Sequence, residues 1–245
     1  MLAGVADPDD LNEAAYSRMR WNTALSVAHA ELLLDRLDLR AGQRIADLGC
    51  GWGELLLTAV ARAGAGASGI GVDSDVTLLD RGRQQAARRG LAVEFAEADA
   101  AGWRGAVDRA LCVGASHAFG GTRAALTTLA EVVPAGGRLL FGDAFWEREP
   151  SEAAFAIFGD ALAPLPALLE AVRATGWRVI HLSAADQREW DDFESTFRAG
   201  RQEWLLANPG HPKAAQIRDW LDQREREYVE AYRGVAGLAY LVLAH

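Results

Sequence analysis

The chain has 245 residues, half of them hydrophobic, so it can bury a full core without the support of disulfides. Its formal net charge of −9, with Lys213 as the single lysine, argues against a nucleic-acid phosphate backbone as a partner. No apolar run approaches the about 20 residues of a membrane-spanning helix, and Cys50 and Cys112 make no disulfide framework, which favours a cytoplasmic, reducing setting without membrane contact.

Strands and helices are predicted to alternate along most of the chain. The first ten residues lack the basic region and the apolar core of a signal peptide, and a helix is predicted over 12–39. Strands are then predicted over 44–48, 67–73, 92–98, 107–113, 138–143, 177–182 and 237–244, and further helices over 54–63, 76–89, 122–133 and 165–175. This alternation predicts the α/β class, with a parallel sheet connected by right-handed crossovers.

The segment 44–54 carries the strongest functional signal. An apolar strand runs into Asp47 and then into Gly49, Gly51 and Gly53 before a helix begins. Parallel sheets bind cofactors at such a place, because glycine lets the backbone approach a ligand and the helix N-terminus faces the same spot. An ordinary tight turn explains one glycine, but it does not explain three glycines and an acid.

Two phosphate-binding motifs fit this segment poorly. A dinucleotide fingerprint needs a third glycine where this chain has Glu54, and a Walker loop needs a Gly-Lys-Ser/Thr run that is absent. The run Asp47-Leu-Gly-Cys-Gly-Trp-Gly53 instead resembles the acid-x-Gly-x-Gly-x-Gly motif of class I S-adenosylmethionine (SAM) methyltransferases. SAM carries an ammonium and a sulfonium group where a dinucleotide carries phosphates, so a carboxylate suits it.

The resemblance covers about residues 40–182 and 237–244, and it implies a Rossmann-like, doubly wound sheet of seven strands with an antiparallel last strand. It also implies that SAM is the cofactor and that the following residues bind it: Asp47, Gly49, Cys50, Gly51, Gly53, Asp73, Ser74, Asp99, Ala100 and Gly114. In this reading Asp73 accepts hydrogen bonds from the ribose hydroxyls, and Asp99 with the Ala100 amide meets the adenine. Strand-end acids also serve as helix caps, and Asp75 is the more natural cap of the next helix.

The loop 114–121, Gly-Ala-Ser-His-Ala-Phe-Gly-Gly, lies where the family places groups near the transferred methyl. It lacks the Asn/Asp-Pro-Pro-Tyr/Phe tetrapeptide of many enzymes that methylate nucleic-acid amino groups or glutamine amides. His117 is the candidate catalytic base, because imidazole takes up protons near neutral pH; the alternative is a loop histidine that only hydrogen-bonds. The runs at 50–54, 116–121 and 189–194 look like those of a set of bacterial small-molecule methyltransferases.

Candidates for the acceptor site are mainly aromatic. They are Tyr16 and Trp21 from the predicted N-terminal helix, Asp143 and Trp146 after the fifth strand, and Trp190 from the segment before the last strand. An acid beside a tryptophan suits a cationic or amine acceptor. Acids on loops are also commonly solvated, and aromatic stripes at helical spacing are usually core, so both interpretations stay open.

Segment 186–236 is predicted to be a helical insert before the last strand, opened by a capping box at Asp186 and Glu189. The expected organisation is an N-terminal helical cap over 1–40, a SAM-binding core over 41–185, a substrate lid over 186–236 and the final strand over 237–245. The predicted function is methyl transfer to oxygen, nitrogen or carbon of a small-molecule acceptor. A SAM-binding regulator without catalysis and an NAD(P)-dependent oxidoreductase are the alternatives. The scattered histidines show no paired metal-ligand spacing, so no metal site is expected.

Overall fold

The structure, a computed structural model, describes residues 16–245. Its sheet has the strand order β3–β2–β1–β4–β5–β8–β7, and β6 pairs with β5 outside this path. The strands are β1 (Arg44–Leu48), β2 (Ser68–Asp73), β3 (Val93–Glu97), β4 (Arg109–Val113), β5 (Arg138–Trp146), β6 (Ala163–Pro164), β7 (Arg178–Ala184) and β8 (Ala236–Ala244). Strands β1 to β5 pair in parallel, whereas β8 runs antiparallel to β5 and β7. The predicted Rossmann-like fold with an antiparallel last strand is therefore confirmed, with β6 as a two-residue addition.

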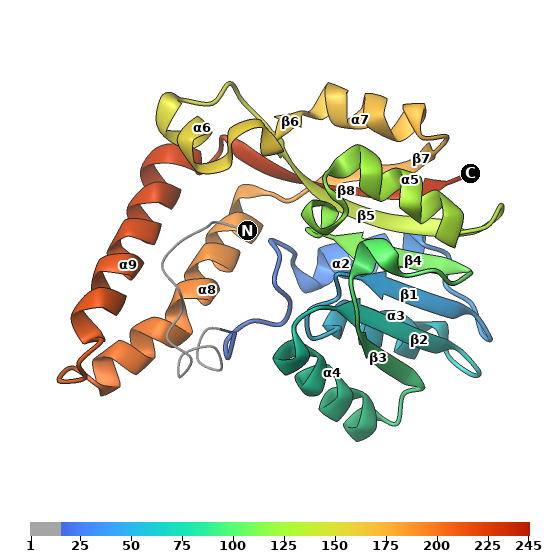
Figure 1. Ribbon diagram of the computed structural model, residues 1–245, viewed down its shortest axis with the longest axis horizontal. Helices are drawn as coiled ribbons and strands as arrows, with labels where there is room; N and C mark the ends of the chain where they lie inside the picture. The colour runs from blue at the N-terminus through green and yellow to red at the C-terminus, as the bar shows by residue number, and fades with distance from the viewer. Residues whose placement is uncertain (1–15) are drawn as a thin grey trace.

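Helices cover both faces of the sheet (Figure 1). The α-helices are α2 (Val27–Arg36), α3 (Glu54–Ala63), α4 (Val76–Arg89), α5 (Thr122–Val132), α6 (Glu152–Phe158), α7 (Leu165–Ala174), α8 (Gln187–Ala207) and α9 (Ala214–Arg226). Short helical turns are η2 (Ala100–Gly102), η3 (Ser116–Phe119), η4 (Gly159–Ala161) and η5 (Glu227–Tyr232). The bounds of α3 and α4 are those predicted from the sequence. Gly90 ends α4 because it adopts a left-handed backbone with φ of 63°, which glycine tolerates without strain.

Two hydrophobic cores lie on opposite faces of the sheet. Strand β8 shows the division: Leu238, Tyr240 and Val242 pack with α2 and α3, while the alternate residues Leu241 and Leu243 pack with α5 and α7. Side chains of a strand alternate between faces, so a strand apolar at every position belongs in the middle of a sheet covered on both sides. The burial of β8 residues from Ala236 to Leu243 agrees with this position.

The predicted helix over 12–39 is wrong in extent: of its described part, only α2 is helical, and residues 16–26 form turns and bends. We call residues 16–26 the strap. Several of its carbonyl groups accept hydrogen bonds from distant side chains, although those of Tyr16 and Ser26 also accept one from an amide three or four residues ahead. Arg81 donates to the carbonyls of Tyr16 and Met19, and Trp52 donates to that of Arg20. Ser26 then caps α2 by accepting a hydrogen bond from the amide of His29. The portion over 12–15 lies outside the described residues.

The helical segment predicted before the last strand is present as α8, α9 and η5, with α8 and α9 standing as a pair of helices beside the sheet (Figure 1). Asp186 and Glu189 form the expected capping box at the start of α8. Glu194 on α8 is almost fully buried, and it accepts hydrogen bonds from Arg224 of α9 and from the Tyr232 hydroxyl. These bonds fix α9 and η5 against α8. No helix within residues 16–245 is long and apolar enough to cross a membrane.

Candidate functional site

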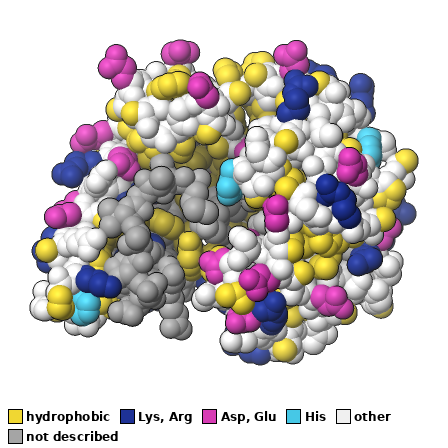
Figure 2. All heavy atoms as spheres, viewed as in Figure 1, with side chains coloured by type: hydrophobic (Ala, Val, Ile, Leu, Met, Phe, Trp, Pro, Cys, Tyr) yellow, Lys and Arg dark blue, Asp and Glu magenta, His cyan; other side chains and the backbone are white. Residues whose placement is uncertain are grey.

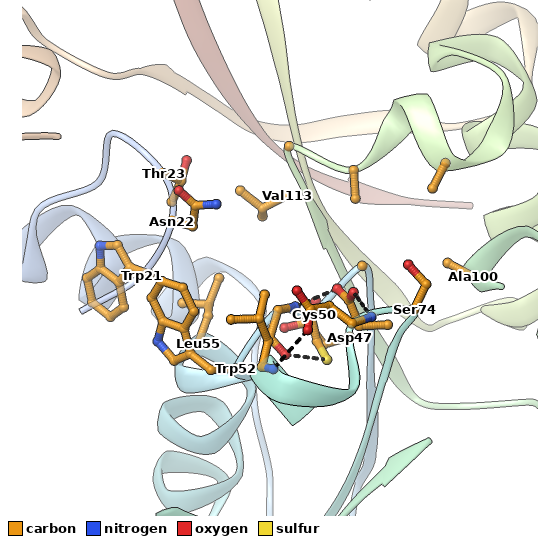
Figure 3. Close-up of a pocket in the computed structure, with 18 of the residues that line it drawn as sticks. Trp21, Asn22, Thr23, Asp47, Cys50, Trp52, Leu55, Ser74, Ala100 and Val113 are labelled. Carbon is orange, nitrogen blue, oxygen red and sulfur yellow. Dashed lines mark hydrogen bonds between the residues drawn. The ribbon is translucent and has the colours of Figure 1, made fainter. Parts of the chain in front are cut away.

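A cavity of about 680 Å³ opens at the carboxyl ends of β1, β2, β3 and β4. Its floor is the glycine-rich turn that follows β1, and its sides are the segments that follow the other three strands. The strap contributes Tyr16, Trp21, Asn22 and Thr23 to the lining. Figure 3 shows Trp21, Asn22 and Thr23 at one end, Ser74 and Ala100 at the other, and Asp47 and Cys50 between them.

The three glycines of the turn have different structural reasons. Their φ angles of 81°, 54° and 66° at Gly49, Gly51 and Gly53 all lie in the left-handed region that favours glycine. A Cβ at Gly49 would come within 2.3 Å of the Ala115 Cβ, and one at Gly53 within 2.4 Å of the Phe95 ring. A Cβ at Gly51 would meet only a methyl carbon of Leu78 at 3.9 Å. Gly49 and Gly53 therefore permit close packing within the protein, while Gly51 presents bare backbone beside the cavity.

Asp47 is a buried acid on the cavity floor. The residue is 5% exposed, and no hydrogen bond within residues 16–245 satisfies its carboxyl group. Burial, reinforced by repulsion from the nearby Asp73 carboxylate, raises the pKa of Asp47 to about 8. A buried carboxyl that lacks a counterion gains most from a positively charged ligand.

Asp73 and Asp75 make different contacts at the end of β2. Asp73 accepts hydrogen bonds from the amides of Gly51 at 2.8 Å and Asp75 at 3.0 Å, so it joins the end of β2 to the turn after β1. Asp75 caps α4, as the sequence indicates, by accepting from the amides of Thr77 and Leu78.

Asp99 and Ala100 lie at the far end of the cavity, after β3. Asp99 begins η2 by accepting a hydrogen bond from the Ala101 amide at 3.0 Å. Its carboxylate therefore has a structural partner in addition to its place in the cavity lining.

All ten predicted cofactor residues except Gly53 line this cavity. Gly53 lies between two lining residues and starts α3. The cavity is also lined by Asn22, Thr23, Leu55 and Leu78, which were not predicted from the sequence. Leu55 and Leu78 occupy the first turns of α3 and α4, so the rule that ligands bind where helices follow strands could have identified them. Asn22 and Thr23 carry no such local signal.

His117 faces the cavity from η3. Its side chain is exposed, and no hydrogen bond to its ring is found among residues 16–245. The loop around it is fixed from below by Asp143 of β5. Asp143 accepts hydrogen bonds from Ser116 at 2.9 Å and from Thr122 at 2.6 Å. Ser116 begins η3 and Thr122 begins α5, so the two bonds hold both ends of the segment that carries His117.

Asp143 is neither solvated nor part of the cavity lining. It is 8% exposed, and burial raises its pKa although the bonds from Thr122 and Ser116 oppose that shift. Trp146 and Trp190 also lie outside the lining: Trp146 packs edge-on against Phe158, and Trp190 packs against Tyr232. Of the five predicted acceptor-site residues, only Tyr16 and Trp21 line this cavity.

The helices α8 and α9 contribute no described side chain to the cavity. Helix α8 contacts the strap instead. The Tyr16 ring lies between Trp52 at 5.3 Å and Phe197 of α8 at 6.3 Å, and Arg18 forms an exposed ion pair with Glu203 of α8.

Metal-binding and disulfide chemistry find no support in the described part of the chain. Within residues 16–245 no group of three or more His, Cys, Asp or Glu could hold a metal ion. Cys50 and Cys112 are both free thiols, and burial raises the pKa of each.

Comparison with protein families gives one match that covers most of the chain. Residues 7–186 match the family model described as mycolic acid cyclopropane synthetase. Among curated proteins, the chain is similar to YjhP of Escherichia coli (strain K12), with 32% identity over 216 residues, 84% of this chain and 86% of that protein.

Two solved structures extend the similarity to nearly the whole chain. A SAM-dependent methyltransferase from Thiobacillus denitrificans, in complex with S-adenosyl-L-homocysteine (SAH), has 31% identity and a TM-score of 0.84, covering 98% of this chain and 99% of its own. A SAM-dependent methyltransferase from Geobacter sulfurreducens, also in complex with SAH, has 27% identity and a TM-score of 0.85 with the same coverage.

Proposed function

The chain belongs to the mycolic acid cyclopropane synthetase family of SAM-dependent methyltransferases, and we propose that it transfers the methyl group of SAM to an oxygen, nitrogen or carbon atom of a small molecule. The acidic cavity on the glycine-rich turn is the observation that carries the proposal. The structural relatives from T. denitrificans and G. sulfurreducens, solved with SAH, support SAM as the cofactor.

The charge of the lining fits a cationic cofactor. Five carboxyl groups and no Lys or Arg side chain line the cavity in residues 16–245; the acids are Asp47, Glu54, Asp73, Asp75 and Asp99, of which Glu54 is paired with Arg89 outside the lining. SAM carries a sulfonium and an ammonium group, so these acids attract it, whereas the pyrophosphate of a dinucleotide would be repelled. This charge disfavours the NAD(P)-dependent alternative more strongly than the missing third glycine does.

Each end of the cavity offers a different chemistry. We assign the end at Ser74, Asp99 and Ala100 to the nucleoside, with Asp73 toward the ribose, and the floor at Asp47 and Gly51 to the positively charged part of the cofactor. Bare backbone at these two glycines leaves room for close approach: a Cβ at Gly51 would meet only Leu78 at 3.9 Å, and a Cβ at Gly114 would meet nothing within 4 Å. The remaining end, at Tyr16 and Trp21, is then available to the acceptor.

When bound, SAM supplies an activated methyl group on a good leaving group. The chain's own contribution is to orient the acceptor and to exclude water. Tyr16 and Trp21 present ring surface for packing an acceptor. His117 is positioned to take a proton from an acceptor hydroxyl or amine, because its ring faces the cavity without a competing partner among the described residues.

We propose the same division of labour that the sequence suggests: a SAM-binding core over 41–185 and 237–245, covered by the N-terminal cap over 1–40 and the helical lid over 186–236. The contacts of Tyr16 and Arg18 with α8 support a joint role of cap and lid. In the view of Figure 2, acidic and basic side chains are interspersed, without the broad basic patch typical of nucleic-acid binding.

The proposal is tested with methyl-labelled SAM and a fractionated small-molecule extract from bacterial cells. We expect release of SAH together with label in a small-molecule product. Asp73→Ala should abolish both, because Asp73 also holds the Gly51 amide. Asp80→Ala is the matched control, since Asp80 is an exposed acid on α4 whose carboxylate pairs with Arg83. Tight SAM binding with no labelled product in any fraction would favour the non-catalytic regulator instead.

A further inference from the structure

The strap is held over the cofactor cavity by one arginine that does not line the cavity. Arg81 lies on α4, and its guanidinium donates hydrogen bonds to the carbonyls of Tyr16 and Met19, each at 3.1 Å. The same guanidinium lies over the Trp52 ring, with its carbon 4.3 Å from the ring centroid. One side chain therefore joins three parts of the site: the strap, the glycine-rich turn and α4.

Trp52 completes this attachment. Its indole Nε1 donates to the Arg20 carbonyl at 2.7 Å, and its ring contacts Tyr16 on the strap. Three of the five carbonyls over residues 16–20 are thus bound by side chains from the cofactor-binding core. This length of strap has no helix or strand of its own, so these bonds fix its backbone relative to the cavity.

Gly82, the next residue along α4, determines where the Arg81 side chain lies. A Cβ at Gly82 would come within 2.6 Å of the Phe95 ring and 2.9 Å of the Trp52 carbonyl oxygen. Only glycine lets α4 approach the turn so closely, and this approach puts the side chain of Arg81 over the Trp52 ring. Arg83, two residues on, instead pairs with Asp80 and bonds to the Phe95 carbonyl, away from the strap.

We propose that Arg81 is a positioning residue that holds the strap closed over the cavity and thereby sets how fast the cofactor exchanges. The proposal rests on the proposed function only in taking SAM and SAH as the occupants. The strap residues Tyr16, Trp21, Asn22 and Thr23 form one wall of the cavity, so movement of the strap away from the core would widen the exit for an occupant. The two bonds and the ring contact at Arg81 must break in that movement.

The test measures SAH dissociation by stopped-flow tryptophan fluorescence for the wild type and for Arg81→Met, Arg81→Lys and Arg83→Met. We expect Arg81→Met to raise the dissociation rate by about tenfold, because charge-assisted hydrogen bonds are lost and affinity changes of this kind appear mainly in dissociation. Arg81→Lys should rescue little, because an ammonium cannot stack flat on a ring and reach two carbonyls at once. Arg83→Met should leave the rate unchanged.

A second readout needs no cofactor. In amide hydrogen exchange of the ligand-free protein, Arg81→Met should raise exchange over 16–23 while exchange in β1 and α3 stays at the wild-type level. Trp52→Phe keeps a ring beneath Arg81 but loses the bond to Arg20, so it should raise exchange over 16–23 to a smaller extent.

The possible failures are distinguishable. If the wild type binds SAH and Arg81→Met neither speeds its release nor raises exchange over 16–23, the positioning role is overturned. If the wild type binds no SAH while Arg81→Met still loosens the strap, the proposed function fails and the role of Arg81 in holding the strap stands.

Discussion

The floor of the cavity and the strap are held in place by different means. The floor, residues 47–53, is determined by local backbone requirements: three left-handed residues, two close contacts beneath them and a helix that starts at once. The strap, residues 16–26, is fixed by side chains that are far away in sequence: Arg81, Trp52, Tyr240 and Glu189. Substitutions in the floor should therefore disturb both the fold and ligand binding, whereas substitutions that affect the strap should act through the loss of individual hydrogen bonds.

The largest effect is expected in the floor, for Gly49→Ala. The new Cβ would meet Ala115 at 2.3 Å and the residue would need a φ of 81°. Together the strain and the overpacking should cost about 2–4 kcal/mol of unfolding free energy, and SAM binding should be lost. Gly136→Ala is the control, because Gly136 has a φ of 83° but a Cβ there would meet nothing within 4 Å.

Urea denaturation of both variants separates the two contributions to the Gly49→Ala effect. Gly136→Ala should lose only the conformational part, about 1–2 kcal/mol. Equal losses in the two variants would show that the contact with Ala115 relaxes freely, and the floor would then be less rigid than its geometry indicates.

Glu189→Gln should have the next largest effect, and it tests how the strap is attached. One buried carboxylate accepts from the amides of Ser26 and Asp186 and from His29, so it ties the end of the strap to the start of α8. The amide of glutamine would face one of those N–H donors and leave it unpaired, at a cost of about 2–3 kcal/mol. Glu203→Gln, which breaks only the exposed pair with Arg18, should cost less than about 1 kcal/mol.

The pH dependence of the Glu189 contribution has a definite sign. Burial raises the pKa of Glu189, but the hydrogen bonds from His29 and Ser26 outweigh it and lower the pKa to about 2. Because the pKa is depressed in the folded state, the stabilisation is present above the usual pKa of a glutamate and is lost as the pH falls toward 2. Urea denaturation should show the gap between wild type and Glu189→Gln narrowing from pH 7 to pH 3. A constant gap would mean that the charge contributes nothing.

The smallest effect is expected for Asp75→Ala. Asp75 caps α4 with bonds to the amides of Thr77 and Leu78, and loss of such a cap costs about 1 kcal/mol. Thermal unfolding should detect this loss, while SAH affinity should change much less than in Asp73→Ala. A loss of affinity as large as that of Asp73→Ala would show that Asp75 binds the cofactor directly in addition to capping α4.

The same contrast explains what the sequence can predict. The turn over 47–53 and helices α3 and α4 are encoded by residues next to one another, such as the glycine that ends α4, so their positions can be predicted closely. The strap cannot, because the side chains that bind its carbonyls, among them Arg81, Trp52 and Tyr240, are brought close only by the fold. The buried place of Asp143 outside the cavity lining could not be predicted for a related reason: its partners Ser116 and Thr122 come within hydrogen-bond distance only when β4 and β5 pair.

Calorimetric titration with SAM at pH 6.5, in two buffers of different ionisation enthalpy, tests the central claim that this acidic cavity binds a cationic cofactor. With a pKa of about 8, Asp47 is protonated in the ligand-free protein at this pH. A bound cation favours the ionised form, so binding should release close to one proton in the wild type and none in Asp47→Asn, which should also bind more weakly. Equal binding of SAM by both proteins without proton release, or binding of NADH in place of SAM, would contradict the account.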